Sequence, residues 1–267
     1  MARRKPIVLT PMSTTVLPSK SGLVKAAFER PQRYLDKRRC DIRIRAETVR
    51  SFTAGQTFTR VLDVGCGDGS ISLPLLSQAT RMTLLDLSSG MASIAQSNVP
   101  QGFAENVEVR NEDFMTASFD SSCFDLIVCL GVLGHVDSPE EFIKKLSALL
   151  RPAGRLILEF TDSRHFMGRL VRMMNRLREI GAPSRYQANL LSFANVDRLC
   201  TKQGLRLVSV FRYDMLPLPN LPGLRRVLGP GSLYRLTRVI FGTCEHNRNA
   251  KLGNEYICLL TRQAEPT

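Results

Sequence analysis

The stretch VLDVGCGDGS, residues 61–70, decides the fold of this chain. An apolar run reaches Asp63, and from Gly65 onward three glycines stand at every second position. Glycine lets a chain turn sharply and lets a ligand lie against bare backbone. A P-loop would need a lysine after the glycines, and a dinucleotide turn would need glycine at position 70, where Ser70 stands. The loop therefore predicts a pocket for a ligand that is cationic or zwitterionic near Asp63, because a carboxylate would repel a pyrophosphate.

Short strand-like runs alternate with helical stretches around this loop. Strands are expected at residues 60–65, 82–87, 107–113, 124–130 and 154–160, and helices at 69–79, 89–98 and 138–150. The last helix has a strong N-terminal signature, because Ser138, Pro139 and two glutamates open it. The alternation is typical of an α/β fold with a doubly wound parallel sheet, whose strand-to-helix connections share the carboxyl edge.

The remaining segments are expected to surround this core. Two connections are unusually long, and long loops in a compact domain commonly serve as lids. The division we expect is a tail and helical cap at 1–57, a core at 58–162, a lid insertion at 163–192, and completion of the core at 193–267 with a cover insertion at 213–254.

The charge of the chain is unevenly distributed. The net charge is +13, yet residues 61–160 hold 6 basic against 13 acidic side chains, so the flanking segments carry the positive excess. A basic surface attracts phosphate, carboxylate or anionic headgroups, although it is also compatible with a merely soluble surface. No apolar run is long enough to span a membrane, and the 7 cysteines include no C-x-x-C pair. We expect a cytoplasmic protein with free thiols and no metal site.

Two further acids follow strands at the same predicted edge. Asp86 ends the second strand, where a carboxylate can accept both hydroxyls of a ribose. Asp113 follows the third strand, where it can accept from an exocyclic amine while Phe114 or Leu87 packs on the ring. Each acid alone could be a cap or a surface residue. Their order on successive strand ends favours a nucleoside pocket.

At this point the sequence resembles the class I S-adenosylmethionine (SAM)-dependent methyltransferases. The resemblance covers residues 58–162 and rests on the motifs VLDVGCGDG, LLDLS, NEDF, FDLIVCLGVLGHVDSP and LLRPAGRLIL. It implies a seven-stranded sheet that ends in an antiparallel hairpin, with residues 205–214 and 255–262 as the sixth and seventh strands.

The resemblance also implies a cofactor site. It assigns the methionine end to Asp63, Gly65 and Gly67, the ribose to Asp86, and the adenine amine to Asp113. The remaining expected contacts are Leu87, Phe114, the backbone of Leu130, and Tyr34 in the helical cap.

A base is needed only if the methyl acceptor arrives protonated, as a hydroxyl does. The 3 histidines, His135, His165 and His246, all fall in connections predicted at the carboxyl edge. We rank His246 and His165 ahead of His135, whose place in LGHVDSP also suits local packing. Asp162 and Tyr186 are reserve candidates.

The predicted lid contains a helical pattern over residues 165–181, with an apolar face and an arginine face. This helix can be an adaptable wall for an apolar substrate, a contact with an anionic membrane surface, or a helix packed on the core. The predicted function is O-methylation of a small apolar or aromatic metabolite, with a phosphate or carboxylate as an optional feature.

Three alternatives remain open. They are a nucleic-acid methyltransferase, a methyltransferase of a lipid-linked substrate at a membrane surface, and an inactive partner subunit. The first would suit the basic flanks, but no N-P-P-Y type motif follows the fourth strand. The three acids of the cofactor site argue against the last.

Overall fold

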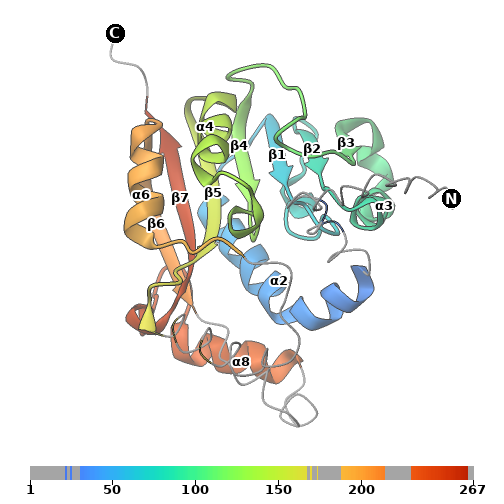
Figure 1. Ribbon diagram of the computed structural model, residues 1–267. Coiled ribbons are helices and arrows are strands. Elements are labelled where there is room, and N and C mark those ends of the chain that lie inside the picture. Colours follow the sequence, from blue (N-terminus) through green and yellow to red (C-terminus); the bar gives the residue numbers. More distant parts are fainter. Residues whose placement is uncertain are drawn as a thin grey trace, which may run out of the picture.

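The computed structural model describes Gly22, Lys25, residues 31–166, Arg169, Met173, residues 188–213 and residues 230–263. These residues form one seven-stranded sheet with helices around it (Figure 1). The strands are β1 Arg60–Val64, β2 Arg81–Leu85, β3 Val107–Arg110, β4 Phe124–Cys129, β5 Leu150–Thr161, β6 Leu205–Tyr213 and β7 Glu255–Arg262. The main helices are α2 Pro31–Thr53, α3 Ser89–Asn98, α4 Pro139–Leu149, α6 Phe193–Lys202 and α8 Pro230–Phe241.

The strand order is β3-β2-β1-β4-β5-β7-β6, and only β7 runs antiparallel to its neighbours. This confirms the predicted mostly parallel sheet with an antiparallel hairpin at its end. In the register, Val64 of β1 pairs with Leu85 of β2, and Leu85 pairs with Arg110 of β3. The segments that follow these three strands therefore begin side by side at the carboxyl edge.

Both faces of the sheet are buried. In β4, Leu126 and Val128 belong to one apolar cluster while Ile127 and Cys129 belong to another, and all four side chains are fully buried. The first cluster includes residues of α2 and α8, and the second includes residues of α4 and α6. Alternate side chains of a strand point to opposite faces, so a continuous apolar run is what a doubly covered strand requires.

The helices at 89–98 and 138–150 are confirmed. Ser138 caps α4 by accepting from the backbone N–H of Glu141, with Pro139 in the first turn. Ser88 caps α3 in the same way, accepting from Met91. None of the described helices combines the length and apolarity that a membrane span requires.

The predicted helix over residues 69–79 is wrong. This segment forms turns and one short 3-10 helix, η1, at Leu73–Leu75. Pro74 cannot donate a helical hydrogen bond, and the backbone of Leu76 is already extended at ψ 137°. The buried hydroxyl of Ser72 donates instead to Asp63 at 2.6 Å, which holds the loop onto the strand.

Figure 1 shows α2 and α8 at the end of the sheet toward which β1 and β5 point. The two helices are joined by Glu47 of α2, which accepts from Tyr234 at 2.7 Å and pairs with Arg238 of α8. The helix α8, which belongs to the predicted cover insertion, therefore packs against α2 of the helical cap. Most of the predicted lid helix at 165–181, and Tyr186, lie outside the described residues.

Candidate active site

A cavity of about 210 Å³ lies at the carboxyl edge of β1, β2 and β4. The loops that follow these strands form its floor, and α2 contributes Tyr34, Leu35, Ile42 and Arg45 to its wall. Ligands of open α/β sheets bind in this position, outside the carboxyl ends of the strands. The cavity is therefore the candidate active site.

The glycine loop presents bare backbone to the cavity. Gly65 has φ +74°, and a Cβ there would lie 2.3 Å from Cγ2 of Val132. Gly67 has φ +57°, but a Cβ there would meet nothing within 4 Å. Both glycines adopt a left-handed conformation that other residues rarely tolerate. The close packing at Gly65 shapes the loop, and the open space above Gly67 lets a ligand approach the backbone.

Asp86 holds this loop from β2. Its Oδ2 accepts from the backbone N–H of Gly67 at 2.9 Å, and its Oδ1 accepts from Ser88 at 2.8 Å. Each carboxylate oxygen can accept a second hydrogen bond, which a pair of ribose hydroxyls could donate. Burial raises the pKa of Asp86, and the two backbone donors partly oppose this effect.

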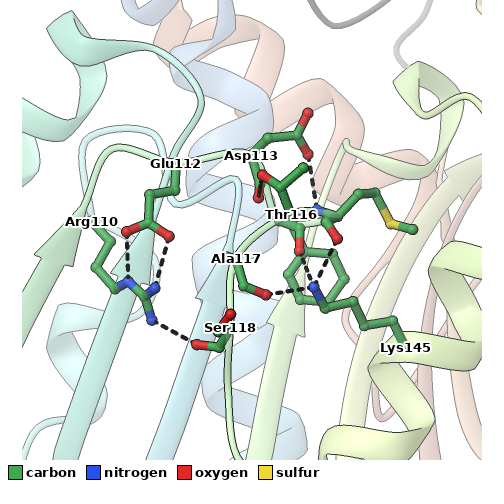
Figure 2. A network of polar contacts seen from close by, with 9 residues as sticks. Arg110, Glu112, Asp113, Thr116, Ala117, Ser118 and Lys145 are labelled. Atoms are coloured by element: carbon green, nitrogen blue, oxygen red, sulfur yellow. Dashed lines mark hydrogen bonds and ion pairs between the residues drawn. The ribbon is translucent and has the colours of Figure 1, made fainter.

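Asp113 lines the cavity from the turn after β3. Its Oδ1 accepts from the backbone N–H of Met115 at 2.9 Å, and Figure 2 shows the second carboxylate oxygen directed away from that turn. Phe114 is buried against Phe142, with ring centroids 4.9 Å apart, and Leu87 also lines the cavity. The turn therefore offers an acceptor oxygen beside apolar walls.

Asp63 stands near the end of β1. It is 3 % exposed, accepts from Ser72, and does not belong to the described cavity lining. Burial raises its pKa to about 7, and the nearby Asp86 and Asp68 add to the shift. Asp63 is thus held to the glycine loop through Ser72, and Asp68 of that loop lines the cavity.

The histidines are separated by the fold. His135, in the segment after β4, lines the cavity together with Leu130, which agrees with the predicted place of Leu130. His165 contacts the carbonyl oxygen of Lys251 through Nε2 at 2.8 Å, and His246 is exposed; neither belongs to the described cavity lining. The ranking of His246 and His165 ahead of His135 is therefore not supported, because a shared sheet edge does not bring their loops to one cavity. Asp162 is also elsewhere, accepting from the backbone N–H of Arg164 and Phe193.

Sequence reasoning missed Arg45. This residue lies in a helix crowded with basic residues, and no spacing distinguishes it from its neighbours. In the structure Arg45 lines the cavity and forms a buried ion pair with Glu159 of β5. Only the packing of α2 on the sheet separates it from the exposed arginines of the same helix.

These residues fit an adenosyl sulfonium. The open backbone at Gly67 accommodates a close ligand, Asp86 suits a ribose, and Asp113 beside Phe114 suits an adenine. The carboxylates around the loop also favour a positively charged sulfonium over a phosphate group.

The chain is similar in sequence to known methyltransferases. Residues 32–210 match the family model described as "Methyltransferase domain". A ubiquinone biosynthesis O-methyltransferase of Coxiella burnetii is 28% identical over 163 residues, covering 60% of this chain and 69% of the relative. One from Xanthomonas euvesicatoria is 32% identical over 100 residues, covering 37% of this chain and 41% of the relative.

Solved structures show the same fold. Magnesium protoporphyrin IX methyltransferase from Synechocystis, solved with bound S-adenosylhomocysteine, aligns with a TM-score of 0.61 at 18% identity, over 92% of this chain and 100% of that one. A phosphoethanolamine N-methyltransferase from Haemonchus contortus aligns with a TM-score of 0.64 at 13% identity, over 93% of this chain and 61% of that one.

The chain belongs to the methyltransferase domain family. It is a SAM-dependent class I methyltransferase of the small-molecule type.

Proposed function

We propose that this enzyme methylates a hydroxyl oxygen of a small apolar or aromatic acceptor. The observation that carries the proposal is the place of His135, the one histidine among the described residues that lines the cavity. The relatives named ubiquinone biosynthesis O-methyltransferase support the same reaction type.

The cavity walls suit an apolar acceptor. Leu35 and Ile42 of α2 face the cavity from one side, and Val132 and Val136 from the segment after β4. Lys25 also lines the cavity, where its charge would suit a carboxylate or phosphate on the acceptor. The anionic end of the acceptor remains part of this proposal.

SAM, when bound, supplies the methyl group from its sulfonium. Methyl transfer is an in-line displacement that depends on proximity, alignment and exclusion of water. In the proposal, Asp86 and the Gly67 backbone hold the nucleoside half, and α2 closes the cavity against solvent. His135 accepts the proton of the acceptor hydroxyl, so that the oxygen attacks as the better nucleophile.

The test is a panel of acceptors incubated with SAM and the purified chain. The panel contains phenols with and without a carboxylate, their amine counterparts, and short-chain analogues of ubiquinone precursors that bear a free phenolic hydroxyl. Mass spectrometry should find the added methyl on oxygen, and release of S-adenosylhomocysteine should match product formation. Turnover of the amines alone would overturn the proposal.

A lipid-linked acceptor at a membrane surface is a second proposal. Phe166 and Leu190 are 55% and 70% exposed, and exposed Arg164 lies in the same part of the chain as Phe166. Apolar side chains beside basic ones suit an anionic membrane surface. Flotation with anionic vesicles should carry the protein to the lipid fraction. Flotation absent at low salt would contradict this proposal.

A further inference from the structure

The turn that presents Asp113 is held by a residue of a different element. Lys145 of α4 directs its ammonium group at three backbone carbonyl oxygens (Figure 2). The distances from Nζ are 2.6 Å to Phe114, 3.0 Å to Met115 and 2.7 Å to Ala117. An ammonium has three N–H donors, so these contacts match its full capacity.

The ammonium also lies 4.9 Å from the centroid of the Phe114 ring. Hydrogen bonds from a charged donor are about twice as strong as neutral ones. Lys145 therefore fixes both the backbone and the ring of the segment that walls the adenine side of the cavity.

Hydrogen bonds within the turn also hold Asp113. The carbonyl oxygen of Asp113 accepts from Thr116 and Ala117 at 3.1 and 2.9 Å, while its Oδ1 accepts from Met115. These bonds orient the Asp113 backbone and side chain together. Any shift of residues 114–117 would therefore move the carboxylate.

Further contacts tie the turn to the sheet. Arg110 at the end of β3 pairs with Glu112 at 2.7 Å and donates to the carbonyl oxygen of Ser118 at 3.3 Å (Figure 2). Asn111 donates to the carbonyl oxygen of Asp86 at 2.9 Å. These contacts hold the two ends of the turn. Lys145, which belongs to α4, holds the residues between them through their carbonyl oxygens.

We propose that Lys145 is a positioning residue for recognition of the adenine amine. By donating to three carbonyls of the turn, it holds the Asp113 carboxylate where the amine of the cofactor arrives. This inference rests on the assignment of Asp113 to the adenine amine. Lys145 itself contacts the turn and does not line the described cavity.

The test measures binding of two nucleosides by calorimetry. S-adenosylhomocysteine carries the amine, and S-inosylhomocysteine carries an oxygen in its place. Lys145→Met keeps an unbranched side chain as far as Cε but removes the ammonium. We expect the Kd of the adenosyl compound to rise about tenfold and that of the inosyl compound to change less than about twofold, so that the preference is lost.

Lys144→Met is the matched control, because Lys144 is exposed and its ammonium pairs with Glu141 of its own helix. It should leave both affinities unchanged. A Lys145→Met variant that weakens both compounds equally, or neither, would overturn the proposal, since a general structural role does not alter the preference. Thermal unfolding of the free variant verifies that it is folded.

Asp113→Ala separates this inference from the assignment beneath it. If Asp113 recognises the amine, this variant loses the adenosyl preference, and adding Lys145→Met should cause no further loss. If Asp113→Ala keeps the preference, the adenine assignment is wrong and the inference is overturned with it. If Asp113→Ala loses the preference but Lys145→Met keeps it, the assignment of Asp113 to the adenine amine stands and the proposed role of Lys145 is wrong.

Discussion

Arg45 of α2 and Glu159 of β5 form a buried ion pair that ties the helical cap to the carboxyl edge of the sheet. Nη2 of Arg45 lies 2.7 Å from Oε2 of Glu159, and Nε donates to Oε1 at 3.0 Å. The hydroxyl of Tyr213 donates to the same Oε1 at 2.9 Å. The Glu159 side chain is 1% exposed, so either charge would be left without compensation if its partner were removed.

Replacing one partner of this ion pair should destabilise the protein more than replacing both partners. Arg45→Met or Glu159→Gln alone should lower the free energy of unfolding by about 3–5 kcal/mol, because an isolated buried charge or unpaired partner remains. The double variant should recover more than half of the larger loss. Urea unfolding without cofactor measures all three. As a control, Arg39→Met removes an exposed ion pair with Asp36 and should change the free energy of unfolding by less than about 1 kcal/mol. Additive effects of the Arg45 and Glu159 substitutions in the double variant would contradict the prediction.

Replacing Gly65 or Gly67 by alanine should impair the protein for different reasons. Gly65→Ala should cost about 1–3 kcal/mol of stability even without cofactor, because its Cβ would meet Val132, and Val132→Ala should recover part of it. Gly67→Ala meets open space, so it should cost mainly the backbone strain while weakening SAM binding at least tenfold. Urea unfolding and calorimetry separate the effects. Equal behaviour of the two variants would argue against the open cradle.

Asp86 should be essential for nucleoside binding. Asp86→Ala removes the acceptor expected for the ribose and the bond to Gly67, so the Kd for S-adenosylhomocysteine should rise about 100-fold. Asp120→Ala, an exposed acid outside the described cavity lining, serves as the control. Unchanged affinity in the Asp86 variant, measured by calorimetry, would remove the basis for the ribose assignment.

His135 should matter for the chemical step and not for cofactor affinity. His135→Asn should lower kcat/KM by about 10²–10⁴ with a phenolic acceptor. The Kd for SAM should stay within about twofold. His165→Asn and His246→Asn should leave turnover unchanged, because neither lies in the described cavity lining. Loss of turnover in either of those variants would restore the ranking that the sequence favoured.

Asp63 should make the free protein less stable as the pH rises. Its pKa is about 7 in the folded state against 3.8 for an ordinary aspartate, so the folded state retains a proton that the unfolded state loses. This contribution is fully present below about pH 4 and is lost as the pH rises toward 7. The stability of Asp63→Asn relative to wild type should therefore increase between pH 4 and pH 7. Melting temperatures of both proteins across this range test it, and a constant difference would contradict the shift.

The sequence by itself determined the fold class. Apolar strand runs that lead into Gly65 and Asp86 predict a doubly covered sheet with a pocket at its carboxyl edge, because strand burial and turn chemistry are local properties. Helices opened by Ser88 and Ser138 were predictable for the same reason. The prediction of a helix at 69–79 was wrong. Its apolar pattern was outweighed by Pro74 and by the hydrogen bond from Ser72 to Asp63.

Tertiary structure decided which residues of that edge share one cavity. His135 faces it while His165 and His246 do not, Asp63 is held to the glycine loop through Ser72, and Arg45 enters from a distant helix. Lys145 reaches the Asp113 turn from α4, across 28–31 positions of sequence. Such contacts depend on how separate elements pack against one another, and local residue patterns carry no record of that packing.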